Sequence, residues 1–467
     1  MSKFSSHNSR LVNKYRKKMR FLGFFTAQLL NRRLHKRSKK QQSGTLNSFE
    51  GSRKQQGKKK MKMTLFNDLV CNIPENKGLQ IDDLSEDLLA GILVRLPVKY
   101  ILRCRCVKKS WYFLVQTPMF ITLQLNQQKT IVRNPNSKYL YFENLRKGLL
   151  TIHFDDVQCQ EYCKIKHLPG LPKVSGAWRA VSNGLICTAI LIRSNGYVDN
   201  NIYLWNPLVE KYKTLPDSPL RFSESRWNAL AFGFVSEIND YVVVHVVKPL
   251  HLARGKRDPH SVFISVYSLK SNSWKALSQD KVFVCDIGYN DAVFVNGAAF
   301  WIAKGSDYRR KILCYDTKSD MLRVISLPEY NIDSRPCIPV LHSLGQSSLA
   351  YFLWSKTCNS RIYDYFSMWV LKYDSLNEFS WEKKMSIDTC EGITSIRAEV
   401  LGVRNNGEPI LARSKDLVSY NLDNDEANDF VDSCVSWTPN TNYDYPWECP
   451  PQFVIHPFVE TLALLNI

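Results

Sequence analysis

A strand–turn–strand unit that recurs from about residue 202 onward limits the folds the chain can adopt more than any other feature. Clear copies occupy residues 202–216, 264–277 and 312–325, and weaker copies start at Met368 and Leu417. Each copy has an alternating strand that ends in an aromatic residue, then a polar turn and a second strand. The aromatic residues Trp205, Tyr267, Tyr315, Trp369 and Tyr420 are separated by 62, 48, 54 and 51 residues. This spacing indicates one supersecondary unit used several times.

Further hairpins are predicted between these copies, at residues 181–191, 232–247, 293–303 and 401–413. Two of them contain Asn-Gly, at Asn296–Gly297 and Asn406–Gly407, which is a strong signal for a hairpin turn. Two hairpins in each repeat make four strands, which is typical of a propeller blade. The alternative is a large irregular β-sandwich. We favour an all-β, propeller-like domain over residues 135–462.

A short Leu-rich segment before the strands shows helical periodicity. Its apolar residues Leu84, Leu88, Ile92 and Leu96 have helical spacing, and Leu89 and Leu93 widen the stripe. Asp83 followed by Glu86 predicts an N-cap and a capping box.

Two further short helices are expected after the first. Pro97 suits the first position of a helix, so a second helix is predicted over residues 98–105. Val107, Trp111 and Leu114 predict a third, which Pro118 is expected to end. Three helices this short do not bury all of their apolar surface. The exposed remainder indicates a partner-binding face, unless the helices pack on the rest of the chain.

The charge of the chain is concentrated at its beginning. Residues 1–64 hold 19 of the 63 basic side chains but only one of the 43 acidic ones, so the net charge of the rest is only +2. Such a segment cannot offset its ordering entropy by burial, and we expect a disordered basic tail over residues 1–74. The tail could act as a nuclear-import signal, a transit peptide or a plain solvated tail. Attraction to nucleic acid would come from this tail, non-specifically, and not from the globular part.

Motifs for catalysis, metals and membranes are missing from the sequence. It contains no nucleophile elbow, phosphate loop, dinucleotide fingerprint or His-Glu-x-x-His. The 13 Cys residues form no Cys-x-x-Cys pair, and we expect reduced thiols. Cys159, Cys163 and His167 could suggest zinc, but a fourth ligand is lacking. No apolar run approaches the roughly 20 residues that span a bilayer. We therefore expect no cofactor, no metal and no membrane insertion.

Residues 84–98, followed by residues 101–111, resemble the F-box of plant F-box proteins. The match follows the family pattern LPEDLLxEILxRLPVKSLLRFRCVCKSW at most positions. Residues 181–187, 204–207, 294–297 and 454–460 are similar to strand signatures of the F-box-associated domain, type 1-like. Two departures stand out: Ser85 replaces the usual proline and Lys108 replaces a cysteine. Ser85 suits a helix start, whereas Lys108 matters only if it faces the partner.

The resemblance implies an F-box over residues 78–126 that binds a Skp-type adaptor and, through it, a cullin. The chain would be a non-catalytic subunit of a Skp–cullin–F-box ubiquitin ligase in the nucleus or cytoplasm, and its β domain would bind an unknown target protein. Eight residues are expected to form or support the adaptor face: Leu84, Ile92, Leu93, Leu96, Pro97, Leu102, Val107 and Trp111. Some of them, Trp111 especially, could instead be core. Target-binding candidates are the loops at 217–227, 249–260, 304–310 and 437–447. The alternative function is a nucleic-acid-associated protein acting through the basic tail.

Overall fold

The fold is taken from a computed structural model of the chain. It describes residues 84–131, 139–144, 148–156, 158–166, 178–194, 197–220, 225–249, 261–277, 280–281, 284–287, 292–305, 307, 309–328, 337–345, 347–355, 365–373, 379–388, 400–413, 416–424, 426–429 and 453–466. The predicted basic tail lies outside these residues. The chain divides into two compact units, one with residues 1–92 and 103–112 and the other with residues 93–102 and 113–467.

Four helices precede the strands in the described part of the chain. They are α3 (Glu86–Leu93), α4 (Val98–Cys104), α5 (Lys109–Leu114) and α6 (Pro118–Ile131). The predicted N-cap at Asp83 is wrong, because α3 begins at Glu86 and Ser85 precedes it directly. The Oγ of Ser85 accepts the backbone N–H of Leu88 at 3.4 Å. The serine that replaces the family's proline therefore caps the helix.

Pro118 has a different role from the one predicted. The third helix, α5, already ends at Leu114. Pro118 instead begins α6, where its fixed φ is favourable and its missing N–H costs nothing. The Oγ1 of Thr117 accepts the N–H of Phe120 at 3.1 Å and so caps α6. None of the described helices has the length and apolarity to cross a membrane.

The strands of the described residues form six antiparallel sheets. The first has the order β26 (Phe453–Phe458), β1 (Tyr139–Asn144), β2 (Leu149–Phe154) and β3 (Glu161–Lys164). The second contains β4 (Trp178–Ser182), β5 (Leu185–Ser194), β6 (Tyr197–Asn206) and β7 (Lys211–Thr214). The third contains β8 (Ser225–Val235), β9 (Asp240–Pro249), β10 (Ser261–Ser268) and β11 (Ser273–Ala276), with β12 (Asp280–Lys281) beside β10.

The other three sheets follow the same plan. The fourth contains β13 (Val284–Ile287) and β14 (Val293–Val295), both paired with β15 (Ala298–Gly305), then β16 (Arg310–Asp316) and β17 (Met321–Ser326). The fifth contains β18 (Cys337–Leu344), β19 (Ser348–Ser355), β20 (Tyr365–Tyr373) and β21 (Phe379–Asp388). The sixth contains β22 (Val400–Val403), β23 (Pro409–Arg413), β24 (Asp416–Asn421) and β25 (Glu426–Asp429).

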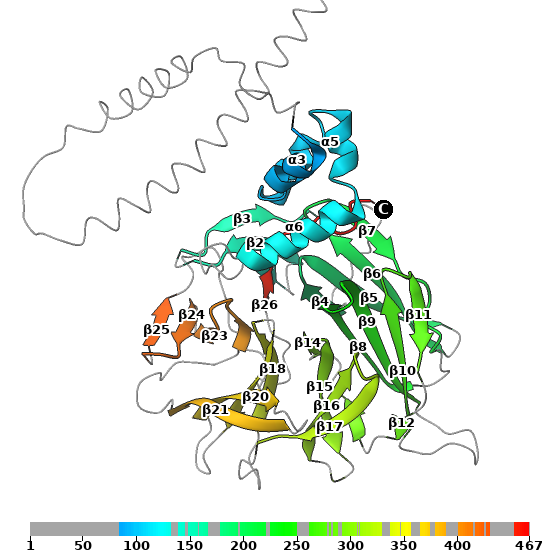
Figure 1. The fold of residues 1–467 in the computed structure, drawn as a ribbon. Helices are drawn as coiled ribbons and strands as arrows, with labels where there is room; N and C mark the ends of the chain where they lie inside the picture. Colours follow the sequence, from blue (N-terminus) through cyan, green and yellow to red (C-terminus); the bar gives the residue numbers. More distant parts are fainter. Residues whose placement is uncertain are drawn as a thin grey trace, which may run out of the picture. The chain divides into compact units, whose positions relative to one another are not determined.

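The six sheets are the blades of a closed β-propeller (Figure 1). Innermost strands of successive blades touch in a ring: β26 with β4, β4 with β8, β8 with β14, β14 with β18, β18 with β22, and β22 with β26. The ring closes inside the first blade, where β26 pairs with β1 from Tyr139↔Phe458 to Asn144↔Phe453. This arrangement confirms the propeller and excludes the irregular sandwich.

Two of the repeated aromatic residues show how a unit of this kind is held together. Tyr267 and Tyr315 end their strands fully buried. Their hydroxyls donate to Asn272 Oδ1 at 2.9 Å and to Asp320 Oδ1 at 2.8 Å. Asn272 and Asp320 have φ of 51° and 54°, which short polar side chains tolerate better than most residues do. One aromatic residue thus fills the space between blades and also fixes the turn that follows it.

Candidate partner-binding surfaces

Helix α3 has two faces of opposite character. Leu89, Ala90 and Leu93 are buried, whereas Leu88 and Ile92 are 60% and 50% exposed. Large apolar side chains held on the open face of a short helix form a surface suited to a partner. Ile92 was expected on this face and lies there. Leu88 was not among the eight candidates, although its four-residue spacing to Ile92 places both on one side of the helix.

The other candidate residues divide by burial. Leu93 and Trp111 are 2% and 3% exposed, so they support the helices from within and offer little surface to a partner. The half-buried candidates are Leu84, Leu96, Pro97, Leu102 and Val107. Adaptor binding by these eight residues stays a prediction.

Helix α5 adds two exposed aromatic side chains that the sequence reasoning missed. Tyr112 is 41% exposed and Phe113 is 66% exposed. The signal was present, because the apolar run of residues 111–115 is too dense for one helix face, and Trp111, Leu114 and Val115 take the buried side.

The departure from the family pattern at Lys108 lies immediately before α5. Its side chain is exposed, and its carbonyl accepts the N–H of Tyr112 at 3.0 Å. Lys108 therefore contributes its backbone to the first turn of the helix, and its side chain lies on the surface.

The propeller has two rims with different connections. Strands alternate in direction within each blade, so turns between first and second and between third and fourth strands lie on one rim. We call this the turn rim; it carries the short turns 183–184, 236–239, 296–297 and 404–408. The opposite rim, the loop rim, joins second to third strands and successive blades. Of the loops proposed for target binding, the described residues 217–220 and 304–305 follow strands that end at the loop rim, whereas 250–260 and 437–447 lie outside the described residues.

Helix α6 contacts the turn rim. The Nδ2 of Asn239, in the β8–β9 turn, donates to Thr122 Oγ1 at 3.3 Å. Strand β1, which follows α6 along the chain, begins at Tyr139, opposite the end of β26 at Phe458. The chain therefore enters the propeller from the turn rim.

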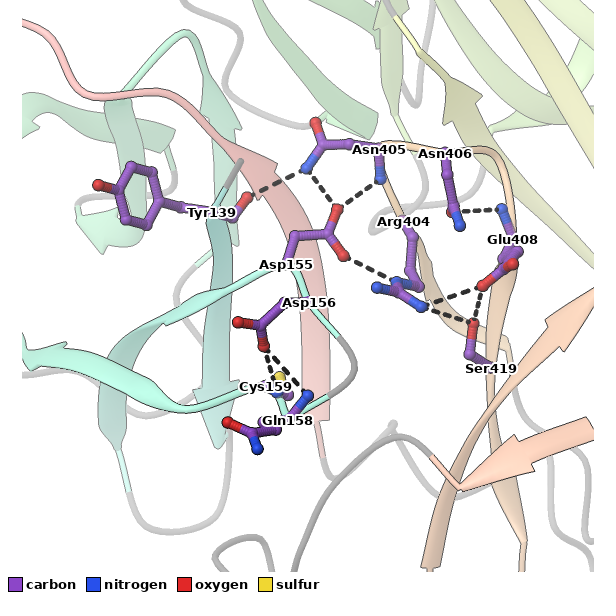
Figure 2. A network of polar contacts seen from close by, with 10 residues as sticks. All are labelled: Tyr139, Asp155, Asp156, Gln158, Cys159, Arg404, Asn405, Asn406, Glu408 and Ser419. Atoms are coloured by element: carbon purple, nitrogen blue, oxygen red, sulfur yellow. Dashed lines mark hydrogen bonds and ion pairs between the residues drawn. The ribbon is translucent and has the colours of Figure 1, made fainter. Parts of the chain in front are cut away.

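A polar network on the turn rim, partly buried and centred on the buried Asp155, joins the first and sixth blades (Figure 2). Asp155, in the β2–β3 turn, accepts the Nε–H of Arg404 at 2.7 Å. It also accepts the N–H and Nδ2 of Asn405 at 3.0 and 2.8 Å. Arg404 continues through Nη1 to Glu408 at 3.0 Å, and Ser419 donates to the same carboxylate. Each group in this chain of contacts has a partner, so the network is a structural lock between blades.

A Ser–His contact between the β7–β8 connection and the third blade does not form a catalytic site. Ser218 Oγ lies 2.7 Å from His245 Nδ1, and Ser265 Oγ lies 3.2 Å from Ser218. All three residues are buried, and a substrate could not reach them. Burial lowers the pKa of His245 to about 4, which fits a packed, neutral imidazole.

Of the three residues considered for zinc, only Cys159 and Cys163 are among the described residues. Cys159 is buried, and its carbonyl accepts from Nδ1 of His153 at 2.8 Å. His167 lies outside the described residues. Across the described parts of the chain, no group of three His, Cys, Asp or Glu side chains is placed to hold a metal ion.

Comparison with known proteins agrees with this architecture. Residues 81–123 match the F-box domain, and residues 151–431 match the F-box associated beta propeller domain. The Arabidopsis thaliana F-box protein At5g49610 is 27% identical over 52% of this chain, which spans 64% of that protein. The F-box/kelch-repeat protein At3g23880 of the same plant is 23% identical over 76% of this chain and 92% of that protein.

Solved structures are more distant. An oligogalacturonate lyase in complex with manganese is 11% identical, with a TM-score of 0.37, over 66% of this chain and 77% of that one. A TM-score this low gives no information about the activity of this chain. The family matches cover both the helices and the propeller, and the chain belongs to the plant F-box proteins with an F-box-associated β-propeller domain.

Proposed function

We propose that the chain is the target-recognition subunit of a Skp–cullin–F-box ubiquitin ligase. Its F-box binds a Skp-type adaptor, its propeller binds a target protein, and the ubiquitin-transfer chemistry belongs to other subunits. The observation that carries this proposal is the exposed apolar face of α3 in a chain that also holds a complete propeller. The chain supplies proximity and orientation, and no group in it is assigned a catalytic role.

Adaptor binding is best attributed to the exposed side chains of the F-box. Leu88 and Ile92 present apolar surface on α3, and Tyr112 and Phe113 do so on α5. Aromatic and aliphatic anchors of this kind dominate the binding energy of many interfaces. The buried Leu93 and Trp111 act indirectly, since they hold the helices that display these anchors.

Target binding is best attributed to the loop rim. The chain enters the propeller from the turn rim, where α6 also lies, so an occupant of the loop rim would not compete with the F-box connection. The loop rim also carries the longer connections, and binding residues concentrate on loops held by a rigid scaffold. We place this activity in the nucleus or cytoplasm.

The adaptor half of the proposal is tested with the full chain. Replacement Leu88→Asp with Ile92→Asp puts two charges in the apolar face, and we expect loss of co-purification with a Skp-type adaptor. The matched control is Ile238→Asp on the turn rim, where Ile238 is 53% exposed. Failure of the unaltered chain to bind any Skp-type adaptor would refute the proposal.

The target half is tested by proximity labelling with the ligase stalled. Asp217→Arg reverses an exposed charge on the loop rim, and Asp423→Arg does the same on the turn rim. We expect the first variant to reduce the labelling of the target and the second variant to leave it unchanged. The opposite result would move target binding to the turn rim.

A further inference from the structure

The segment that follows β26 is buried without belonging to a sheet. Residues 459–465, here called the clasp, leave the last strand and make no strand pairing. All seven are buried, from Thr461 and Leu462 at 0% to Val459 at 8% exposed. Backbone groups in such a segment need partners other than a β-ladder, and side chains from two different elements, α6 and β6, bind several of them.

Two buried amide side chains hold the backbone of the clasp. Gln124 of α6 donates through Nε2 to the carbonyl of Glu460 at 3.2 Å and accepts the N–H of Leu462 at 3.3 Å. Asn206, at the end of β6, donates through Nδ2 to the carbonyls of Thr461 and Ala463 at 2.8 and 2.9 Å. Both amides are fully buried, so the clasp joins α6 to the second blade.

The side chain of Glu460 extends this junction to the F-box. Its Oε2 accepts the N–H of Val98, the first residue of α4, at 3.1 Å, although the two residues are 362 positions apart. Its Oε1 accepts the hydroxyl of Tyr162 on β3 at 2.9 Å. Glu460 is 2% exposed, and burial raises the pKa of its carboxyl group. A buried carboxyl is costly unless it is hydrogen-bonded, and here both oxygens have donors.

The second blade is shaped to admit the clasp. Gly184 sits in the β4–β5 turn with φ of +81°, and a Cβ there would lie 2.1 Å from the carbonyl oxygen of Val459. The neighbouring Asn183 is also held in place, because its carbonyl accepts a hydrogen bond from the hydroxyl of Tyr241 at 2.9 Å. A larger residue at position 184 would push the clasp away.

We propose that the clasp is a positioning device, and that Glu460 is its key residue. It fixes residues 93–102 and α6, which belong to the same compact unit as the propeller, so that a bound target is held at a set place relative to the adaptor-face candidates Leu96, Pro97 and Leu102 of that unit. This inference rests on the proposed ligase function. Transfer between two bound groups depends strongly on their orientation, and a loose junction lowers the effective concentration of one at the other.

The test is self-ubiquitylation of the full chain in a reconstituted ligase, with the modified propeller lysines mapped by mass spectrometry. Glu460→Ala removes both hydrogen bonds. Tyr162→Phe removes only one and keeps the ring, so it serves if Glu460→Ala fails to fold. Glu460→Gln can accept from Val98 and donate to Tyr162, so it should restore the junction. Glu143→Gln is the control, because Glu143 is similarly buried (3% exposed) but bonds only to Tyr141 and Arg179 within the blades among the contacts described.

We expect unaltered adaptor binding in all variants. Glu460→Ala should lower the modification rate of the preferred lysines by about tenfold and spread modification over additional lysines. Tyr162→Phe should cause a smaller fall in rate and less spreading. Glu460→Gln should keep the original pattern of modified lysines. The positioning role of the clasp would be refuted by an unchanged lysine pattern in Glu460→Ala and Tyr162→Phe. The same spreading in Glu143→Gln would also refute it. Absence of adaptor binding in the unaltered chain would instead overturn the ligase function.

Discussion

Removal of the Asp155 carboxylate tests how the propeller ring is held closed. The carboxylate joins the first and sixth blades, and its side chain is 3% exposed, against 12% for Arg404. Asp155→Ala leaves the guanidinium of Arg404 with Glu408 and Ser419, and the N–H of Asn405 without its acceptor. Breaking a buried ion pair on one side costs about 3–5 kcal/mol. Because Arg404 keeps a second carboxylate, we expect the lower end, about 3 kcal/mol.

The assay is denaturant unfolding of the full chain followed by tryptophan fluorescence, with Asp155→Asn as the graded variant. Asparagine keeps an acceptor for one donor but loses the charge, so about 1.5 kcal/mol is expected. The control is Lys275→Ala, which breaks an ion pair to Asp320 whose partners are 66% and 43% exposed. Exposed pairs contribute less than about 1 kcal/mol. If Asp155→Ala and Lys275→Ala destabilised the chain equally, the lock between the blades would be refuted.

Four further predictions follow from the same contacts. Burial holds the pKa of His245 near 4, below its unfolded value of about 6.5, so its contribution to stability is present above pH 6.5 and is lost as the pH falls toward 4. His245→Gln should therefore flatten the fall in the denaturation midpoint between pH 7 and pH 5, and an unchanged slope would contradict the assignment. Gly184→Ala should destabilise the chain by more than about 1 kcal/mol in the same assay, because the new methyl meets a backbone oxygen at positive φ. Trp111→Ala should lower the melting temperature, with a cost of about 3–5 kcal/mol, whereas Ile92→Ala should weaken adaptor binding with little change in melting; the reverse result would exchange their roles. Deletion of residues 1–64 should abolish salt-dependent nucleic-acid binding in a filter assay, and binding that survives the deletion would show a second site in the globular part.

Local features of the sequence were sufficient for much of the fold. The spacing of Trp205, Tyr267 and Tyr315 predicted the repeated hairpins because one buried aromatic residue and one polar turn recur in each unit. The Leu-rich pattern predicted the first helices because three- and four-residue spacing places side chains on one face. Both signals act over a few neighbouring residues, so they can be read without the rest of the chain.

Helix ends were predicted less well, since competing residues have similar preferences. Asp83 and Ser85 are both good N-caps, and the structure uses Ser85. Pro118 was interpreted as a stop, although proline also starts helices, and Thr117 supplies the cap that makes it a start. In each case the start of the helix depends on which backbone position lets the apolar residues that follow face the interior.

The sequence alone determined that this chain has an F-box, a repeated four-strand unit and a neutral globular part behind a basic tail, because each is written in composition or short-range spacing. Only the tertiary structure decided how the ring closes, which apolar side chains of α3 and α5 remain exposed, and what Glu460 contacts. Those outcomes join residues hundreds of positions apart, such as Val98 and Glu460 or Tyr139 and Phe458. No local preference encodes such a pairing, because it exists only once the two distant segments are folded against each other.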